Sequence, residues 1–400
     1  MNRPSHWIIA TFAILGPVLW VWGFTEGFGT QRETPPAPTG PRQERLEPSD
    51  TQASSPFEAK LEGRVVDQLG QPLAGAQIRV LGGSGAALTR TSGSFEVMVK
   101  LRDPYRRVEV TASGFSSVVE RCSPADLTNF VVQMNAPPPW ATQVPLPLSP
   151  KRSALAGEGF LLDGDRRPVA GAVVTCLETG DSALTDDVGR FLIPVAAAKV
   201  SFVAWHESGT CAEIEASLPA QNEGMVSLGV ATLAEGARLG GAILLPDGTP
   251  AAQAPVVLRR QGLVRRCLAD DGGRFRVHGL VAGDYELEVL PHGGALGIRS
   301  PLHVEGPGNL QTELKLVAEQ PLRVRVVDDA RAPRAGAYVL ASDADERHAW
   351  AETDVDGRAV LRGLSAVGAV VREARDAALV PMKIEGTLAE AETTTIVTSD

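Results

Sequence analysis

One short sequence pattern occurs four times along this chain of 400 residues. Its copies are GRVVDQLGQPLAGAQIRV, GFLLDGDRRPVAGAVVTC, GAILLPDGTPAAQAPVVLR and RVVDDARAPRAGAYVLA, which begin at Gly63, Gly159, Gly241 and Arg325. The proline of each copy lies 96, 82 and 83 residues from the next, at Pro72, Pro168, Pro250 and Pro333. A period this long is that of a whole small domain, so the pattern predicts an array of four similar modules.

The composition favours β-structure. The chain has 41 glycines and 29 prolines, and short runs of β-branched residues are frequent, which is typical of an all-β, turn-rich protein. Each module of roughly 80 residues can bury one core with little surplus. The net charge of -10 argues against nucleic acid as a partner, because nucleic-acid binding needs a basic surface.

Apolar residues in the first module alternate with a period of two, as in half-buried strands. The alternation is seen at Ala76, Ile78 and Val80, and again in the run from Phe95 to Val99. About seven such short runs per module, with turn residues every 8–12 positions, predict a β-sandwich for each module. No helical periodicity of useful length follows residue 25.

The repeated pattern resembles the carboxypeptidase regulatory-like domain, which is a transthyretin-like, seven-stranded sandwich. Module one carries the resemblance in GRVVDQLGQPLAGA at 63–76, and the turn that follows recurs as SGSF at 92–95, TDDVGRF at 185–191 and ADDGGRF at 269–275. Module four departs from it, since Ala359 replaces the phenylalanine of the turn. The resemblance implies tandem transthyretin/immunoglobulin-like sandwiches over residues 58–400, and it brings no catalytic residue.

The N-terminus predicts a membrane anchor. Residues 7–24, WIIATFAILGPVLWVWGF, contain no charge, and at ~1.5 Å per residue a helix of this length just crosses a bilayer. Tryptophans near both ends favour the membrane interfaces. A cleaved signal peptide is the alternative, although no small-residue cleavage site follows Phe24. In both cases the modules are exported to the periplasm or the extracellular side.

The predicted organisation follows from these signals. It consists of an anchor at 1–25, a proline-rich linker at 26–57, a first sandwich at 58–135, a second proline-rich linker at 136–152, and sandwiches at 153–235, 236–318 and 319–400. The last sandwich is the divergent one. The linkers predict extended, partly polyproline spacers, whereas modules two to four follow one another almost directly and could pack end to end.

Catalytic and metal-binding patterns are not found in the sequence. The six histidines stand singly, no H-E-x-x-H or G-x-S-x-G motif occurs, and no cofactor is expected. Acidic turns such as Asp270-Asp271 could attract calcium, but two or three carboxylates fall short of the six to eight oxygens that calcium takes. Aspartate is also the ordinary residue of a tight turn.

The cysteines offer one candidate disulfide. Cys176 and Cys211 both lie in module two, and thiols of an exported protein oxidise readily. A bridge between them would stabilise a small domain by ~3 kcal/mol. Four cysteines allow three complete pairings, and the sequence does not choose among them.

Two tryptophans are candidate ligand platforms. Trp205 follows an alternating strand in module two, and Trp350 precedes an acidic turn in module four. Both could stack on sugar rings, or they could seal contacts between modules. The sequence therefore predicts a non-enzymatic, membrane-anchored envelope protein whose modules in series act as a spacer or as a scaffold for an envelope or extracellular protein. An array of carbohydrate-binding modules that recognise envelope or extracellular glycans is the alternative.

Overall fold

The computed structural model of the protein describes residues 58–83, 85–100, 106–141, 155–195, 199–218, 224–365, 368–390 and 393–399, without the side chains of 385–390, 393, 397 and 399. The predicted anchor at 7–24 and the linker at 26–57 lie outside these ranges. The described residues form β-strands and one short 3-10 helix, η1 (Pro124–Asp126), which confirms the all-β prediction. None of them belongs to a helix long and apolar enough to span a bilayer.

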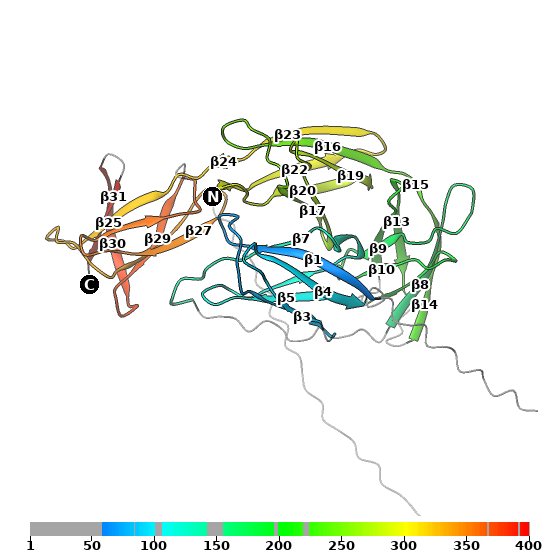
Figure 1. Ribbon diagram of the computed structural model, residues 1–400, viewed down its shortest axis with the longest axis horizontal. Coiled ribbons are helices and arrows are strands. Elements are labelled where there is room, and N and C mark those ends of the chain that lie inside the picture. The colour runs from blue at the N-terminus through cyan, green and yellow to red at the C-terminus, as the bar shows by residue number, and fades with distance from the viewer. Residues whose placement is uncertain are drawn as a thin grey trace, which may run out of the picture. The chain divides into compact units, whose positions relative to one another are not determined.

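Module one is built from two sheets (Figure 1). The first has the order β4-β1-β7, from β1 (Glu58–Val66), β4 (Ser94–Lys100) and β7 (Phe130–Gln133). The second has the order β3-β2-β5-β6, from β2 (Gln77–Leu81), β3 (Ala86–Leu88), β5 (Arg107–Thr111) and β6 (Val118–Arg121). β1 is antiparallel to β4 and parallel to β7. The alternating residues predicted to point inward, such as Ile78 and Phe95, meet in one buried core between the sheets.

Modules two and three repeat this arrangement. In module two the sheets are β11-β8-β14 and β10-β9-β12-β13-β15, formed by β8 (Leu155–Leu162), β9 (Val173–Cys176), β10 (Ser182–Leu184), β11 (Arg190–Pro194), β12 (Lys199–Trp205), β13 (Thr210–Ser217), β14 (Gly224–Thr232) and β15 (Ala234–Glu235). In module three they are β19-β16-β23, β18-β17-β20-β22 and the short pair β21-β24. Its strands are β16 (Ala237–Leu244), β17 (Pro255–Arg260), β18 (Leu263–Leu268), β19 (Arg274–Leu280), β20 (Gly283–Val289), β21 (Ala295–Leu296), β22 (Ile298–Val304), β23 (Asn309–Lys315) and β24 (Val317–Ala318).

Module four differs in how its strands are joined. All of its strands belong to one sheet of order β27-β26-β29-β30-β31-β25-β28. They are β25 (Leu322–Val327), β26 (Tyr338–Ser342), β27 (His348–Glu352), β28 (Arg358–Leu361), β29 (Val370–Arg375), β30 (Pro381–Glu390) and β31 (Thr393–Ser399). The long β30 pairs with β29 at its start and with β31 along most of its length. It therefore connects two halves that form separate sheets in the other modules.

The repeated aspartate and glycine serve turn geometry. In module one, one carboxylate oxygen of Asp67 accepts hydrogen bonds from the backbone N–H groups of Leu69 and Gln71, both at 2.8 Å. Gly93 has a φ of +71°, and a Cβ there would lie 2.5 Å from the Val65 carbonyl oxygen. The glycine recurs in all four modules and the aspartate in modules two and four, where module three has Leu245. These positions therefore fix turns rather than supply chemistry.

A second glycine makes room for a ring. In module two, Gly159 pairs with Phe191 across the sheet, and a Cβ on the glycine would lie 2.5 Å from the phenylalanine ring. At the equivalent positions module four has Val324 paired with Ala359. In module two the larger residue of the pair lies on β11, whereas in module four it lies on β25, the strand equivalent to β8. The core of module four is therefore still filled although its sequence diverges.

Candidate functional site

One outward sheet face recurs in all four modules, and we call it the docking face. It comprises β2, β3 and β5 in module one, β9, β10 and β12 in module two, β17, β18 and β20 in module three, and β26, β27 and β29 in module four. The same cross-strand pair can be identified on this face in every module. Its members are Arg79 and Ala86 in module one, Thr175 and Ser182 in module two, Val257 and Arg266 in module three, and Leu340 and Trp350 in module four.

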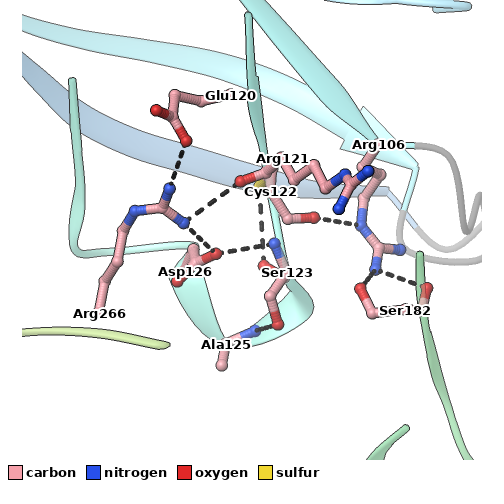
Figure 2. Close-up of polar contacts among 9 residues, drawn as sticks. All are labelled: Arg106, Glu120, Arg121, Cys122, Ser123, Ala125, Asp126, Ser182 and Arg266. Atoms are coloured by element: carbon pink, nitrogen blue, oxygen red, sulfur yellow. Dashed lines mark hydrogen bonds and ion pairs between the residues drawn. The ribbon is translucent and has the colours of Figure 1, made fainter. Parts of the chain in front are cut away.

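In module three the docking face carries a buried arginine that reaches module one (Figure 2). The guanidinium of Arg266 lies 2.9 Å from the Asp126 carboxylate and 2.8 Å from that of Glu120, and it also donates to the carbonyl oxygen of Arg121 at 3.2 Å. The Arg266 side chain is 3% exposed and that of Asp126 is 1% exposed. The ion pair between Arg266 and Asp126 is therefore almost completely buried.

The backbone around η1 positions the acceptor of this ion pair. The Ser123 N–H donates to Asp126 Oδ2 at 2.8 Å, and the Ser123 hydroxyl accepts from the Ala125 N–H (Figure 2). Burial raises the pKa of Asp126 above its ordinary value, against the opposing charge of Arg266. Burial likewise raises the pKa of the neighbouring Cys122 thiol to about 12, which disfavours its thiolate form.

In module two the docking face also contacts module one. The Arg106 guanidinium donates to the Ser182 hydroxyl at 3.3 Å and to the Ser182 carbonyl oxygen at 3.2 Å, and it holds the Cys122 carbonyl at 3.1 Å (Figure 2). Arg106 is 3% exposed. Modules one, two and three therefore meet at one buried polar junction.

Apolar side chains also join the three modules. Val66 and Val131 of module one form a buried cluster with Val257 and Leu290 of module three. Leu177, Val203 and Cys211 of module two belong to the buried core of module three. The direct contact of modules one and three is not what their order along the chain predicts.

The docking face of module one itself is exposed. Gln77, Arg79, Ala86 and Leu88 are all exposed, and Leu88 retains 66% of its accessible surface. The Arg79 guanidinium is paired with Glu109 at 2.8 Å in this open setting. Among the described residues, the same face is thus covered in three copies and open over β2 and β3 of the first.

Trp205 lies in the contact between modules two and three. It packs against the core of module three, and the Arg265 guanidinium lies 3.8 Å from the centroid of its ring. Its Nε1 is buried. In this position the ring fills a contact between modules rather than offering an open platform for a sugar.

Trp350 is also engaged. Its Nε1 donates to the carbonyl oxygen of Ala136, in the segment that follows module one, at 3.2 Å. Its ring lies 6.1 Å from the ring of Tyr338, which in turn lies 5.9 Å from the ring of Trp140. Both predicted platforms therefore contact other parts of the same chain.

The structure does not bring Cys176 and Cys211 together, and both are free thiols. β12 lies between their strands, where Cys176 pairs with Phe202 and Cys211 pairs with Trp205. Cys176 points into the core of module two, and Cys211 points into the core of module three. Because a disulfide needs Cα atoms within ~7 Å of each other, a pair on opposite faces and two strands apart does not meet its geometry.

The aspartates of the acidic turns accept hydrogen bonds from backbone N–H groups of the same turn. One oxygen of Asp270 accepts from the N–H groups of Gly272 and Arg274, at 2.9 and 2.8 Å, and Asp186 and Asp354 repeat this pattern. Within the described residues no group of three or more His, Cys, Asp or Glu side chains is placed to hold a metal ion.

Sequence reasoning missed Arg266. A signal was present, because the residue equivalent to Trp350 is Ala86, Ser182 and Arg266 in the other copies, so the position changes in size and charge from copy to copy. Alignment of the copies strand by strand would have separated this outward position from the framework.

The sequence matches no protein-family model and no curated protein. Structural similarity is found to a streptococcal ancillary pilin, with 11% identity, a TM-score of 0.21, and coverage of 65% of this chain and 99% of the pilin. The Bacillus anthracis TIE protein has 11% identity and a TM-score of 0.20, with coverage of 86% and 68%. BcpA, the major pilin subunit of Bacillus cereus, has 10% identity and a TM-score of 0.17, with coverage of 61% and 99%. TM-scores this low do not establish a common arrangement.

Proposed function

We propose that this chain is a non-enzymatic scaffold of a cell envelope, in which modules one to three form a packed block. An N-terminal anchor and a proline-rich segment would hold this block at a membrane. The observation that carries the proposal is the Arg266–Asp126 ion pair, because a contact at 3% and 1% exposure fixes module three against module one.

The contacts made by the arginines of the junction and by the two candidate tryptophans support the same proposal. The arginines of the junction and the candidate platforms Trp205 and Trp350 are committed to contacts between parts of the chain. A catalytic or sugar-binding role would need such groups to face a ligand. Glycan binding through the two tryptophans is the second candidate, and it requires the contacts around those rings to open.

The proposal is tested in the host cell with the full chain. Chemical cross-linking followed by mass spectrometry should identify a reproducible set of envelope proteins for the wild type and for Arg79→Ala. Arg266→Ala, which breaks the block, should lose that set. If the full chain instead binds a purified polysaccharide, and Trp205→Ala and Trp350→Ala abolish that binding, glycan recognition replaces the scaffold. Reproducible turnover on a substrate panel would overturn both.

A further inference from the structure

Module four binds a proline-rich segment of its own chain. The segment is Ala-Pro-Pro-Pro-Trp at 136–140, which follows module one. Its receptor is the docking face of module four, where Tyr338, Trp350, Glu373 and Arg375 lie on adjacent strands and point outward together. Four contacts join the two parts.

The first contact satisfies the backbone of the segment. The three prolines lack an N–H group, so within 137–139 only the carbonyl oxygens can hydrogen-bond a receptor through the backbone. The Ala136 N–H donates to Gln68 Oε1 of module one at 3.3 Å. Trp350 Nε1 donates to the carbonyl of Ala136 at 3.2 Å. An aromatic groove whose side chains donate to the carbonyls of an extended proline-rich peptide is a general mode of peptide recognition.

The other contacts hold the aromatic end of the segment. A turn closes with the Ala141 N–H on the Pro138 carbonyl at 2.9 Å, which places Pro139 at the turn position that proline favours. Trp140 then lies edge-on to Tyr338 at 5.9 Å. Its Nε1 donates to Glu373 at 3.2 Å, and Arg375 covers its ring at 5.0 Å.

These groups are particular to module four. The positions equivalent to Tyr338 hold Gln77, Val173 and Pro255, and those equivalent to Trp350 hold Ala86, Ser182 and Arg266. Neither of these two positions carries an aromatic ring in the other modules. The divergence of module four in this region corresponds to a specific binding surface rather than to loss of the pattern.

We propose that the docking face of module four is a binding site for proline-rich peptides of the type Ala-Pro-Pro-Pro-Trp, and that residues 136–140 occupy it as an intramolecular latch. A segment tethered in the same chain has an effective concentration of the order of millimolar, so a free peptide binds only when the latch is opened. The latch fastens module four to the chain between modules one and two, and its release would free both the docking face of module four and the segment.

The test uses the full chain and a fluorescein-labelled peptide of residues 135–141, NAPPPWA, followed by fluorescence anisotropy. Trp140→Ala removes the aromatic end of the latch and should bind the peptide at least tenfold more tightly than the wild type. Trp140→Ala combined with Trp350→Phe, which keeps a ring but removes the donor, should lose at least tenfold of that affinity. Trp140→Ala combined with Trp205→Phe is the matched control and should bind as Trp140→Ala does.

A second peptide and a second variant complete the test. The peptide TPPAPTG, from residues 34–40 of this chain, has prolines but no tryptophan, and it should bind Trp140→Ala at least tenfold more weakly. If Trp140→Ala does not fold, judged by its circular dichroism, the double variant Pro137→Ala, Pro138→Ala opens the latch by removing its extended bias. The proposal is wrong if a folded, open-latch variant binds no NAPPPWA at millimolar concentration, or if Trp350→Phe leaves its affinity unchanged.

Discussion

Modules three and four place opposite chemistry at one equivalent position. Arg266 in module three forms an ion pair with Asp126 at 2.9 Å, whereas Trp350 in module four donates one hydrogen bond to Ala136 and its ring lies tilted against that of Tyr338. Both residues lie on the second strand of the docking face, paired with a residue of the preceding strand. The framework of the module thus leaves one outward position free to define what each copy contacts.

The two solutions differ in their energetics. Burying Arg266 and Asp126 removes two charges from water, and only their mutual attraction and their hydrogen bonds offset that cost. Trp350 buries apolar surface and loses little conformational freedom, and its proline-rich partner is already restricted. We therefore expect loss of the module-three contact to be severe and all-or-none, and loss of the module-four contact to be mild and reversible.

The largest expected effect comes from Arg266→Ala. The substitution leaves the Asp126 carboxyl buried without its counter-charge, so the block of modules one to three should lose about 3–5 kcal/mol of stability. Denaturant unfolding that follows the amides of β7 and β18 by hydrogen exchange measures this loss. The same change in an exposed ion pair of module one, Arg79→Ala, should cost at most about 1 kcal/mol because water screens its bond to Glu109.

If Arg266→Ala and Arg79→Ala lowered the free energy of unfolding equally, the contrast between a buried and an exposed ion pair would be wrong. A double variant tests the same contrast further. Arg266→Met with Asp126→Leu replaces the charges by apolar side chains of similar size, and buried pairs replaced in this way are often neutral or more stable. The double variant should therefore recover most of the loss seen in Arg266→Ala.

A smaller effect is expected inside the framework, where module four has exchanged a glycine–phenylalanine pair for Val324 and Ala359. Gly159→Val in module two should cost about 1–3 kcal/mol, because the new side chain overlaps the Phe191 ring. In the Phe191→Ala background the same valine enters the space left by the ring and should cost much less. Hydrogen exchange of the amides of β8 and β11 gives the two costs, and additive costs would rule out a compensating exchange.

The framework could be predicted from sequence because its determinants are local. Period-two alternation predicted the inward residues such as Ile78 and Phe95, and the turn chemistry of Asp67 follows from residues within four positions. Likewise, the repeat itself was visible as four copies of one pattern. These features need no knowledge of which modules touch.

The docking contacts could not be predicted in this way. Arg266 and Asp126 are 140 residues apart in the sequence. No periodicity relates an arginine on a strand of module three to a carboxylate that follows a strand of module one. Trp205 and Trp350 were singled out as aromatic residues outside the anchor, but their partners Arg265 and Ala136 carry no signal of their own. The predicted Cys176–Cys211 bridge failed for the same reason, since the two face into different cores across β12.

The smallest expected effect is a difference between two buried aspartates, whose contributions to the free energy of unfolding should change with pH in opposite directions. In the junction, burial raises the pKa of Asp126, against the influence of Arg266. In module four, burial also acts to raise the pKa of Asp343, but hydrogen bonds from the Ser365 N–H and from Arg347 outweigh it and lower the pKa. The unfolded chain gives both aspartates an ordinary pKa of about 3.9.

The signs follow from linkage between protonation and folding. Asp126 contributes most below the unfolded pKa, and its contribution is lost as the pH rises toward its raised folded value. Asp343 contributes above the unfolded pKa, and its contribution is lost as the pH falls through its lowered folded value. The stability of the wild type relative to Asp126→Asn should therefore fall with rising pH above about 4, while that relative to Asp343→Asn should rise with pH from acid values to about 4. Denaturant unfolding at intervals from pH 3 to 7 measures both differences, and slopes of the same sign would show that the junction and module four do not differ in how they hold a buried carboxyl.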